Sequence, residues 1–289
     1  MNRSNVVAFA AFFALSFAGW ARGSVAGAVP ASARPVAAAS RPHAGNVVVV
    51  IMENRDYSLI IGSPQAPYIN GTLVPEAALM TNSHAVTHPS LPNYLALFSG
   101  STQGVIDDSC PHTFSSTNVG AALLAAGKSF AGYSESMPGS GSTACFSGKY
   151  ARKHNPWVDF SGVPASSNLV YDGFPASPPQ LAIIAPNLCN DMHDCSTRTG
   201  DNWLRAHLPA VLEYNATHDG LLILTWDEAD PDRSGTNHVA TLLIGPAVVP
   251  GSYSQAVTHY SVLHTIEEAL GAACTLRACR TPVIQGVWK

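Results

Sequence analysis

The sequence offers one serine whose setting suits a nucleophile. Ser90 begins the tetrad Ser-Leu-Pro-Asn, and an apolar run over 94–98 follows it. We expect a helix here, because Ser is common at helix starts and Pro is compatible with the first turn. A helix start presents free N–H groups and the positive end of the dipole, which together bind phosphate. Ser90 is therefore the candidate nucleophile and Asn93 the candidate donor to a phosphoryl oxygen, although a serine that only caps a helix has the same pattern.

Two acidic pairs come directly after strongly apolar runs. Glu53-Asn54 follows a Val-rich run, and Asp227-Glu228 follows a Leu-rich one. Carboxylate, amide and hydroxyl oxygens suit Mg²⁺, Ca²⁺ or Mn²⁺, and a neighbouring His would admit Zn²⁺. One such pair could be a polar strand end that meets water, but two pairs indicate a site for a divalent metal ion. The predicted ligands are Glu53, Asn54, Ser90, Asp227 and Glu228.

Further groups for phosphate binding and proton transfer lie in polar segments. One segment contains Lys153, which could bind phosphate, and His154, which could protonate a leaving group. A polar loop between two cysteines contains His193, a second candidate for acid–base chemistry. His238 begins a later apolar run and is a candidate substrate contact. The alternative interpretation is a solvated basic turn and a polar surface loop.

Several other functions are disfavoured by what the sequence lacks. The chain contains neither G-x-S-x-G nor H-E-x-x-H, which weakens a lipase or esterase hypothesis and a metalloprotease hypothesis. The formal net charge is −4, and no dense run of Lys and Arg occurs. We therefore expect no binding to nucleic acid through its phosphates.

Apolar runs alternate along the chain with helix-like segments. We expect strands over 46–52, 80–86, 129–133, 181–185, 220–226 and 238–244, and helices over 91–99, 118–126, 201–214 and 259–270. Pro209 should kink or split the third helix. Residues 136–180 are rich in Gly, Ser and Pro, which indicates an irregular insertion suited to a substrate pocket. The alternation predicts an α/β fold with a mostly parallel central sheet and helices on both faces. Ligands would then bind beyond the carboxyl ends of the strands, where the acidic pairs fall.

The N-terminal segment has the pattern of an export signal. Residues 1–23 combine an early arginine, a short apolar core and small residues, which predicts a signal peptide; an uncleaved anchor is the alternative. Residues 24–44 are rich in Ala, Pro and Ser and predict a flexible leader. A single catalytic domain over 45–289 follows. We expect a secreted or periplasmic protein with no membrane span in the mature chain, and the sequence does not give its oligomeric state.

The sequence contains 6 cysteines, and an even number in an exported chain favours disulfides. The connectivity is not determined by sequence alone, and zinc thiolates are the less favoured alternative because the spacings match no zinc-finger pattern. Short separations favour Cys189 with Cys195 and Cys274 with Cys279, which leaves Cys110 with Cys145.

The chain resembles the bacterial phosphoesterase family of secreted acid phosphatases and phospholipases C, which is related to the alkaline phosphatase superfamily. The resemblance covers about residues 46–271, and its motifs are specific as an ordered set. They are VVVVIMENRDY, THPSLPNYLALFSG, GYSESMP, YARKHNPW, the DMHDC loop, LTWDEAD, NHVATLLIGP and THYSVLHTIEEALG. Ser-Leu-Pro-Asn is also similar to the Thr-Phe-Pro-Asn nucleophile motif of nucleotide pyrophosphatases.

The resemblance implies an α/β sandwich that carries a metal-dependent phosphomonoesterase. Its site would use Ser90 as nucleophile and ligand, and His154 and His193 for the phosphate or the leaving group. The metal ligands carried over are Glu53, Asn54, Asp227 and Glu228. The Asp-His pair typical of alkaline phosphatase is replaced here by Asp227-Glu228, which disfavours a two-zinc site. The chain looks most like the compact secreted acid phosphatases, some of which act on phosphatidylinositol phosphates.

The resulting hypothesis is a secreted, metal-dependent acid phosphatase. It would hydrolyse phosphate monoesters through a phosphoserine at Ser90, with a small phosphate ester or a phospholipid headgroup as substrate. A phospholipase C that cleaves phosphodiesters is the alternative enzyme. A non-catalytic secreted protein that binds anions on a degenerate hydrolase scaffold is the alternative of another class.

Overall fold

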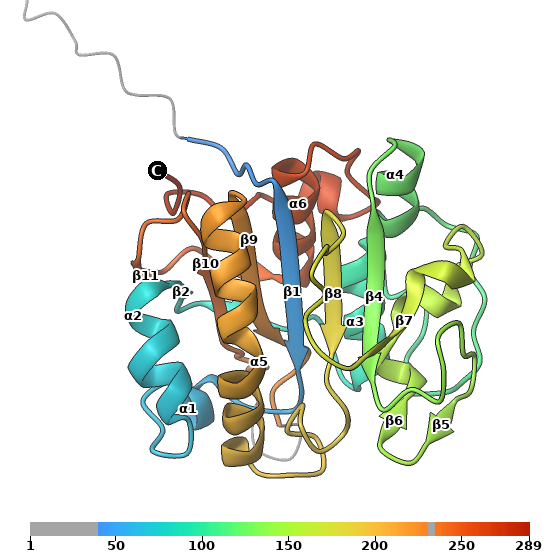
Figure 1. The fold of residues 1–289 in the computed structure, drawn as a ribbon, viewed down its shortest axis with the longest axis horizontal. Coiled ribbons are helices and arrows are strands. Elements are labelled where there is room, and N and C mark those ends of the chain that lie inside the picture. Colours follow the sequence, from blue (N-terminus) through green and yellow to red (C-terminus); the bar gives the residue numbers. More distant parts are fainter. Residues whose placement is uncertain (1–39, 231–234) are drawn as a thin grey trace, which may run out of the picture. The chain divides into compact units, whose positions relative to one another are not determined.

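The computed structural model describes residues 40–230 and 235–289. The predicted signal peptide and all but the last residues of the predicted leader lie outside these ranges. The described chain is built around an eight-stranded sheet (Figure 1). In sheet order its strands are β11 (Gly251–Tyr253), β2 (Ala78–Met80), β10 (Thr241–Ile244), β9 (Gly220–Trp226), β1 (Asn46–Met52), β8 (Leu181–Ala185), β4 (Phe130–Glu135) and β7 (Asn168–Tyr171).

The centre of the sheet is parallel, as predicted. β9, β1, β8, β4 and β7 run in one direction, and β10 runs antiparallel to both of its neighbours. Val and Ile recur along β1 without a polar interruption, because both faces of this strand are covered by helices. The expectation of a mostly parallel sheet with helices on both faces is confirmed.

The two faces of the sheet have separate apolar cores. Val47, Val49 and Ile51 of β1 belong to a core that includes residues of α3 (Ser90–Ser99), α4 (Val119–Ala125) and α6 (His259–Ala269). The alternate residues of β1 belong to a second core with α1 (Tyr57–Ile60) and α5 (Thr197–Thr217). Figure 1 shows α5 in front of the sheet and α3 and α6 behind it. α2 (Val74–Glu76) is a short helix near the β2 edge.

Two predicted elements differ from the structure. The strand predicted over 80–86 is two short strands: β2 ends at Met80, and β3 (Ser83–His84) pairs with β12 (Val257–Thr258) in a separate small sheet. Pro209 neither splits nor ends α5, which runs unbroken through it. Pro209 and Arg205, one turn earlier, are both exposed, so water can bond the carbonyl that the missing N–H leaves free.

The segment 136–180 is only partly irregular. It contains the small hairpin of β5 (Phe146–Ser147) and β6 (Tyr150–Ala151), three short 3₁₀ turns (Arg152–His154, Pro156–Asp159, Ala165–Ser167) and the edge strand β7. No helix among the described residues combines the length and apolar character needed to cross a bilayer.

Candidate active site

Ser90 lies among buried carboxylates that come from two strand ends. Its Oγ is 3.1 Å from Oε2 of Glu53, which follows β1, and 3.3 Å from Oε1 of Glu228, which follows β9. β1 and β9 are parallel neighbours, so their carboxyl ends deliver these acids to the same edge of the sheet. All three residues are at most 2% exposed.

Asn54 and Asp227 complete the predicted ligand set beside this cluster. The Asn54 N–H donates to Oδ1 of Asp227 at 3.2 Å, and the Asp227 N–H donates to the carbonyl of Met52. Asn54 adopts a left-handed φ of 49°, which an asparagine tolerates better than most residues. His259 fixes the other side of Asp227, because its Nε2 contacts the Asp227 carbonyl at 2.5 Å.

The donor set fits a hard divalent cation. Among the described residues, Oδ1 of Asn54 and Oδ2 of Asp227 are buried oxygens without a hydrogen-bond partner. Buried oxygens of this kind are costly unless something binds them. With Glu53, Ser90 and Glu228 they form a set made only of oxygens, the ligand type that Mg²⁺, Ca²⁺ and Mn²⁺ prefer.

The electrostatics of the cluster also favour a cation. Burial and the neighbouring carboxylates of Glu53 and Glu228 raise the pKa of Asp227 well above its usual range. Burial and Glu53 likewise raise the pKa of Glu228 to about 8. Like charges at this spacing cannot all ionise without a compensating positive charge, which a bound metal ion would provide.

His154 lies on the far side of Glu53, between two carboxylates. Its Nε2 is 3.0 Å from Oε1 of Glu53, and its Nδ1 is 3.2 Å from Oδ2 of Asp191. Burial opposes protonation of the ring, but the two carboxylates outweigh it and raise the pKa of His154 to about 9. Burial alone would raise the pKa of Glu53, yet His154 lowers it to about 2. The ring also stacks on Tyr94, whose hydroxyl donates to Oε1 of Glu53 at 2.6 Å.

Lys153 and His193 lie together at the margin of the cluster. Lys153 Nζ is 3.1 Å from Nε2 of His193, and the other ring nitrogen of His193 contacts Asp194 at 2.7 Å. Ligand atoms of Glu53, His154 and His193 lie within 4.8 Å of one another, and among the His, Cys, Asp and Glu side chains of the described residues this is the group of three that could hold a metal ion. Imidazole nitrogens in that group would suit Zn²⁺ better than the oxygen set does.

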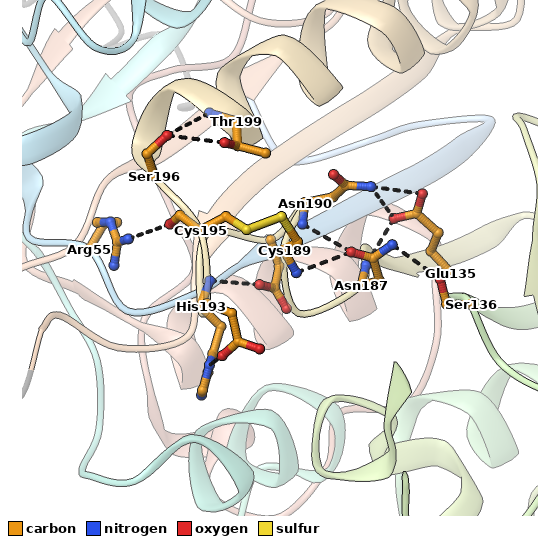
Figure 2. Close-up of a disulfide and its surroundings, with 12 residues drawn as sticks. Arg55, Glu135, Ser136, Asn187, Cys189, Asn190, His193, Cys195, Ser196 and Thr199 are labelled. Carbon is orange, nitrogen blue, oxygen red and sulfur yellow. Dashed lines mark hydrogen bonds and ion pairs between the residues drawn. A yellow bond between two sulfur atoms is a disulfide. The ribbon is translucent and has the colours of Figure 1, made fainter. Parts of the chain in front are cut away.

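The loop that carries His193 is held by a disulfide and by hydrogen bonds (Figure 2). Cys189 and Cys195 are joined, and Arg55 donates to the Cys195 carbonyl. On the other side of the disulfide, Asn187 accepts from the N–H groups of Cys189 and Asn190. The other two predicted pairs, Cys110–Cys145 and Cys274–Cys279, are also joined, so the predicted disulfides are confirmed.

Two predicted site residues have other partners. The Asn93 side chain accepts from the N–H groups of Val86 and Thr87 and donates to the carbonyls of Thr87 and Pro89. Both amide hydrogens are therefore used by the loop before Ser90, and none is left for a phosphoryl oxygen. The structure therefore corrects the predicted role of Asn93, because a buried amide forms its hydrogen bonds with the backbone groups nearest to it.

His238 is the second of these residues. Its ring stacks between Tyr57 and His84, and its Nε2 contacts the Thr81 carbonyl. None of the interactions found among the described residues joins it to Ser90 or to the carboxylates. The structure therefore does not place His238 in the cluster around Ser90.

Three site residues were missed by the sequence analysis. Tyr94 lies one helical turn after Ser90, a spacing that places both on the same face of α3. Asp191 lies in the loop that was singled out for His193. His88 precedes Ser90 by two residues, is partly exposed, and its Nδ1 contacts Oε2 of Glu228 at 2.5 Å. In each case the signal in the sequence was proximity to a residue already singled out, either Ser90 or His193.

Comparisons with known proteins identify the family of this chain. The model of the phosphoesterase family matches residues 64–272. The chain is 42% identical to a phosphatidylinositol-3-phosphatase of Mycobacterium tuberculosis over 91% of this chain and 88% of that protein. It is 30% identical to an acid phosphatase of Aspergillus fumigatus over 77% of this chain, but it spans only 54% of that protein.

Solved structures show the same fold at low sequence identity. A protein of the alkaline phosphatase superfamily from Vibrio parahaemolyticus superposes with a TM-score of 0.60 and 12% identity, over 85% of this chain and 72% of that chain. This likeness confirms the predicted fold, an alkaline-phosphatase-like α/β/α sandwich. With the family match and the mycobacterial relative, it leads to one conclusion: this chain belongs to the phosphoesterase family and is a phosphoric ester hydrolase.

Proposed function

We propose that this protein is an exported, metal-dependent phosphatase that hydrolyses phosphate monoesters through a phosphoserine at Ser90. The proposal depends on one observation. Ser90 begins α3, and its hydroxyl lies within hydrogen-bonding distance of two buried carboxylates. The 42% identity to a phosphatidylinositol-3-phosphatase supports phosphatidylinositol phosphates among the substrates. Three disulfides support an oxidising compartment outside the cytoplasm.

The metal ligands in this proposal are the predicted ones: Glu53, Asn54, Ser90, Asp227 and Glu228. A divalent cation there would supply positive charge that offsets the charge of the phosphoryl group. The single hydrogen of the Ser90 hydroxyl can be donated to the carboxylate of either Glu53 or Glu228, and one of these groups would take the proton as Oγ attacks phosphorus.

The cationic residues have different roles on the substrate side. Lys153 is the proposed phosphate contact, because its side chain is only 11% exposed and its ammonium lies at the margin of the cluster. His193 is 26% exposed and is the better placed histidine to protonate a leaving alcohol. His154 is buried between its two carboxylates, so its proposed role is to orient Glu53 and hold positive charge beside it. Water then hydrolyses the phosphoserine.

The direct test is Ser90→Ala with an aryl phosphate as substrate. We expect turnover to fall at least about 1,000-fold while the circular dichroism spectrum is retained. Ser99→Ala is the matched control, because Ser99 is a buried serine at the other end of α3 whose hydroxyl bonds only backbone and Gln103. Activity of Ser90→Ala equal to that of Ser99→Ala would remove the mechanism.

The substrate class needs a separate experiment. We expect the aryl monoester and phosphatidylinositol 3-phosphate to be hydrolysed faster than an aryl phosphodiester. Chelator should abolish the activity, and add-back of single metal ions should restore it and identify the cation. A preference for the diester would favour a phospholipase C, and no turnover of any ester would favour an anion-binding protein.

A further inference from the structure

Asp108 joins the start of α3 to Lys153. It lies in the loop between α3 and α4, and its Oδ1 accepts the Leu91 N–H at 2.9 Å. Its Oδ2 accepts from Lys153 Nζ at 2.8 Å. One carboxylate therefore contacts the residue after the nucleophile and the proposed phosphate-binding cation at once.

Under the proposed function, phosphate would bind beside Ser90, and both contacts of Asp108 lie next to that position. Leu91 is in the first turn of α3, where N–H groups have no partner within the helix. Pro92 has no N–H, so Leu91 supplies one of the few such donors beside the Ser90 hydroxyl. Lys153 is only 11% exposed, and a flexible ammonium this buried needs an anionic partner to stay charged and in one place.

The two segments that carry this pair are tied together. The Cys110–Cys145 disulfide joins the Asp108 loop to the segment just before β5. Arg152, next to Lys153, donates to the carbonyls of His112 and Thr143, and its N–H donates to the Cys145 carbonyl. The Asp108–Lys153 contact is thus built into the fold and differs from an ion pair between two mobile surface chains.

We propose that Asp108 is a positioning residue that holds the Lys153 ammonium at the start of α3, and so strengthens binding of the phosphoryl group. The inference rests on the proposed function, because it assigns phosphate to Lys153. Asp108 acts through Lys153 and is not itself proposed to contact the substrate. A carboxylate that repelled phosphate, or competed with it for the same donors, would have the opposite effect.

Asp108→Asn separates these effects. The variant retains an oxygen that can accept from Leu91, but it loses the charge and turns an amide donor toward the ammonium. Inorganic phosphate is the probe, and its affinity for the full-length protein as purified is measured by titration calorimetry. We expect Asp108→Asn to weaken phosphate binding about tenfold. Asp108→Glu, which keeps the charge, should recover part of the loss.

The double-mutant cycle with Lys153→Met decides whether Asp108 acts through the lysine. We expect Lys153→Met to weaken binding by a similar factor, and Asp108→Asn to have no further effect in that background. Asp107→Asn is the matched control, because Asp107 is the preceding residue and its hydrogen bonds, among the described residues, go to Ser109. Its phosphate affinity should equal that of the unmodified protein.

Three outcomes would overturn the inference. Unchanged or tighter phosphate binding by Asp108→Asn would show that the carboxylate is neutral or a competitor. A further loss in the Lys153→Met background would show that Asp108 acts independently of the lysine. A complete lack of phosphate binding by the unmodified protein would refute the proposed function along with the inference, so the two failures are distinguishable.

Discussion

Fully buried carboxyl groups occur in two different settings in this protein. Around Ser90, the acids Glu53, Asp227 and Glu228 follow strand ends, and His154 contacts Glu53. Two oxygens of the proposed ligands, Oδ1 of Asn54 and Oδ2 of Asp227, have no hydrogen-bond partner among the described residues. At the other setting, a single acid, Glu267 of α6, accepts from the Thr275 hydroxyl at 2.6 Å through Oε1, and its Oε2 has no hydrogen-bond partner among the described residues. Burial raises the pKa of Glu267 to about 8, so it is neutral at ordinary pH.

The difference shows what separates a functional acid cluster from a structural acid. A single buried carboxyl lowers its free energy by keeping its proton and binding a hydroxyl. Three acids beside one serine cannot all keep a proton and bind a hydroxyl, so a histidinium or a metal ion must balance their negative charge. Substitutions should therefore affect catalysis in the first setting and only stability in the second.

The largest expected effect is at Asp227. Asp227→Asn should lower turnover of an aryl phosphate at least about 100-fold, because it removes charge from the ligand set. The metal content of the purified protein, measured by mass spectrometry, should fall as well. Glu267→Gln is the control and should retain both activity and metal. Equal losses in the two variants would end the distinction between the settings.

His154→Gln tests whether the histidine organises the cluster. We expect a loss of activity of about 10- to 100-fold, because Glu53 loses the partner that orients it and lowers its pKa. His238→Gln is the control, since His238 lies outside the cluster. A loss in His238→Gln as large as that in His154→Gln would restore the original prediction for His238.

Two short disulfides, one in each setting, offer a smaller and matched comparison. Cys189 and Cys195 close the loop beside His193, whereas Cys274 and Cys279 close the loop that carries Thr275. Replacing either pair with Ser should lower the free energy of unfolding by about 2 kcal/mol, since both enclose few residues. Only loss of the first should also raise KM. Unchanged KM in both variants would show that the His193 loop does not need its disulfide.

The smallest effect is a dependence of stability on pH. The pKa of Glu267 is raised in the folded state. Its contribution to stability is therefore fully present at pH values below the pKa that Glu267 has in the unfolded chain, and it is lost as the pH rises through about 8. Glu267→Gln keeps an acceptor for Thr275 and cannot ionise. Urea unfolding at pH 6 and pH 9 should therefore show a smaller loss of stability for this variant. An equal loss in both proteins would mean that Glu267 ionises without cost.

Patterns within the sequence determined most of the framework. The continuous Val and Leu runs of β1 and β9 have only one stable environment, the centre of a sheet covered on both faces, so their ends and the acids that follow were predictable. Ser90 and its helix were predictable because a tetrad at a helix start is a local signal. Two disulfides followed from an even cysteine count and short separations, and Cys110–Cys145 followed as the remaining pair.

Tertiary structure decided which polar groups meet. Asn93 was expected to face the phosphate, but its amide bonds the backbone of the preceding loop. Asp108 gave no signal in the sequence, because its partners Leu91 and Lys153 are brought to it by a disulfide and by a buried arginine. Periodicity reports which residues are buried along a segment, whereas contacts between distant segments depend on how the loops fold back. Ser90, the acids, Lys153 and the two histidines were therefore identifiable in the sequence, whereas the contacts of Asp108 with Leu91 and Lys153 formed only on folding.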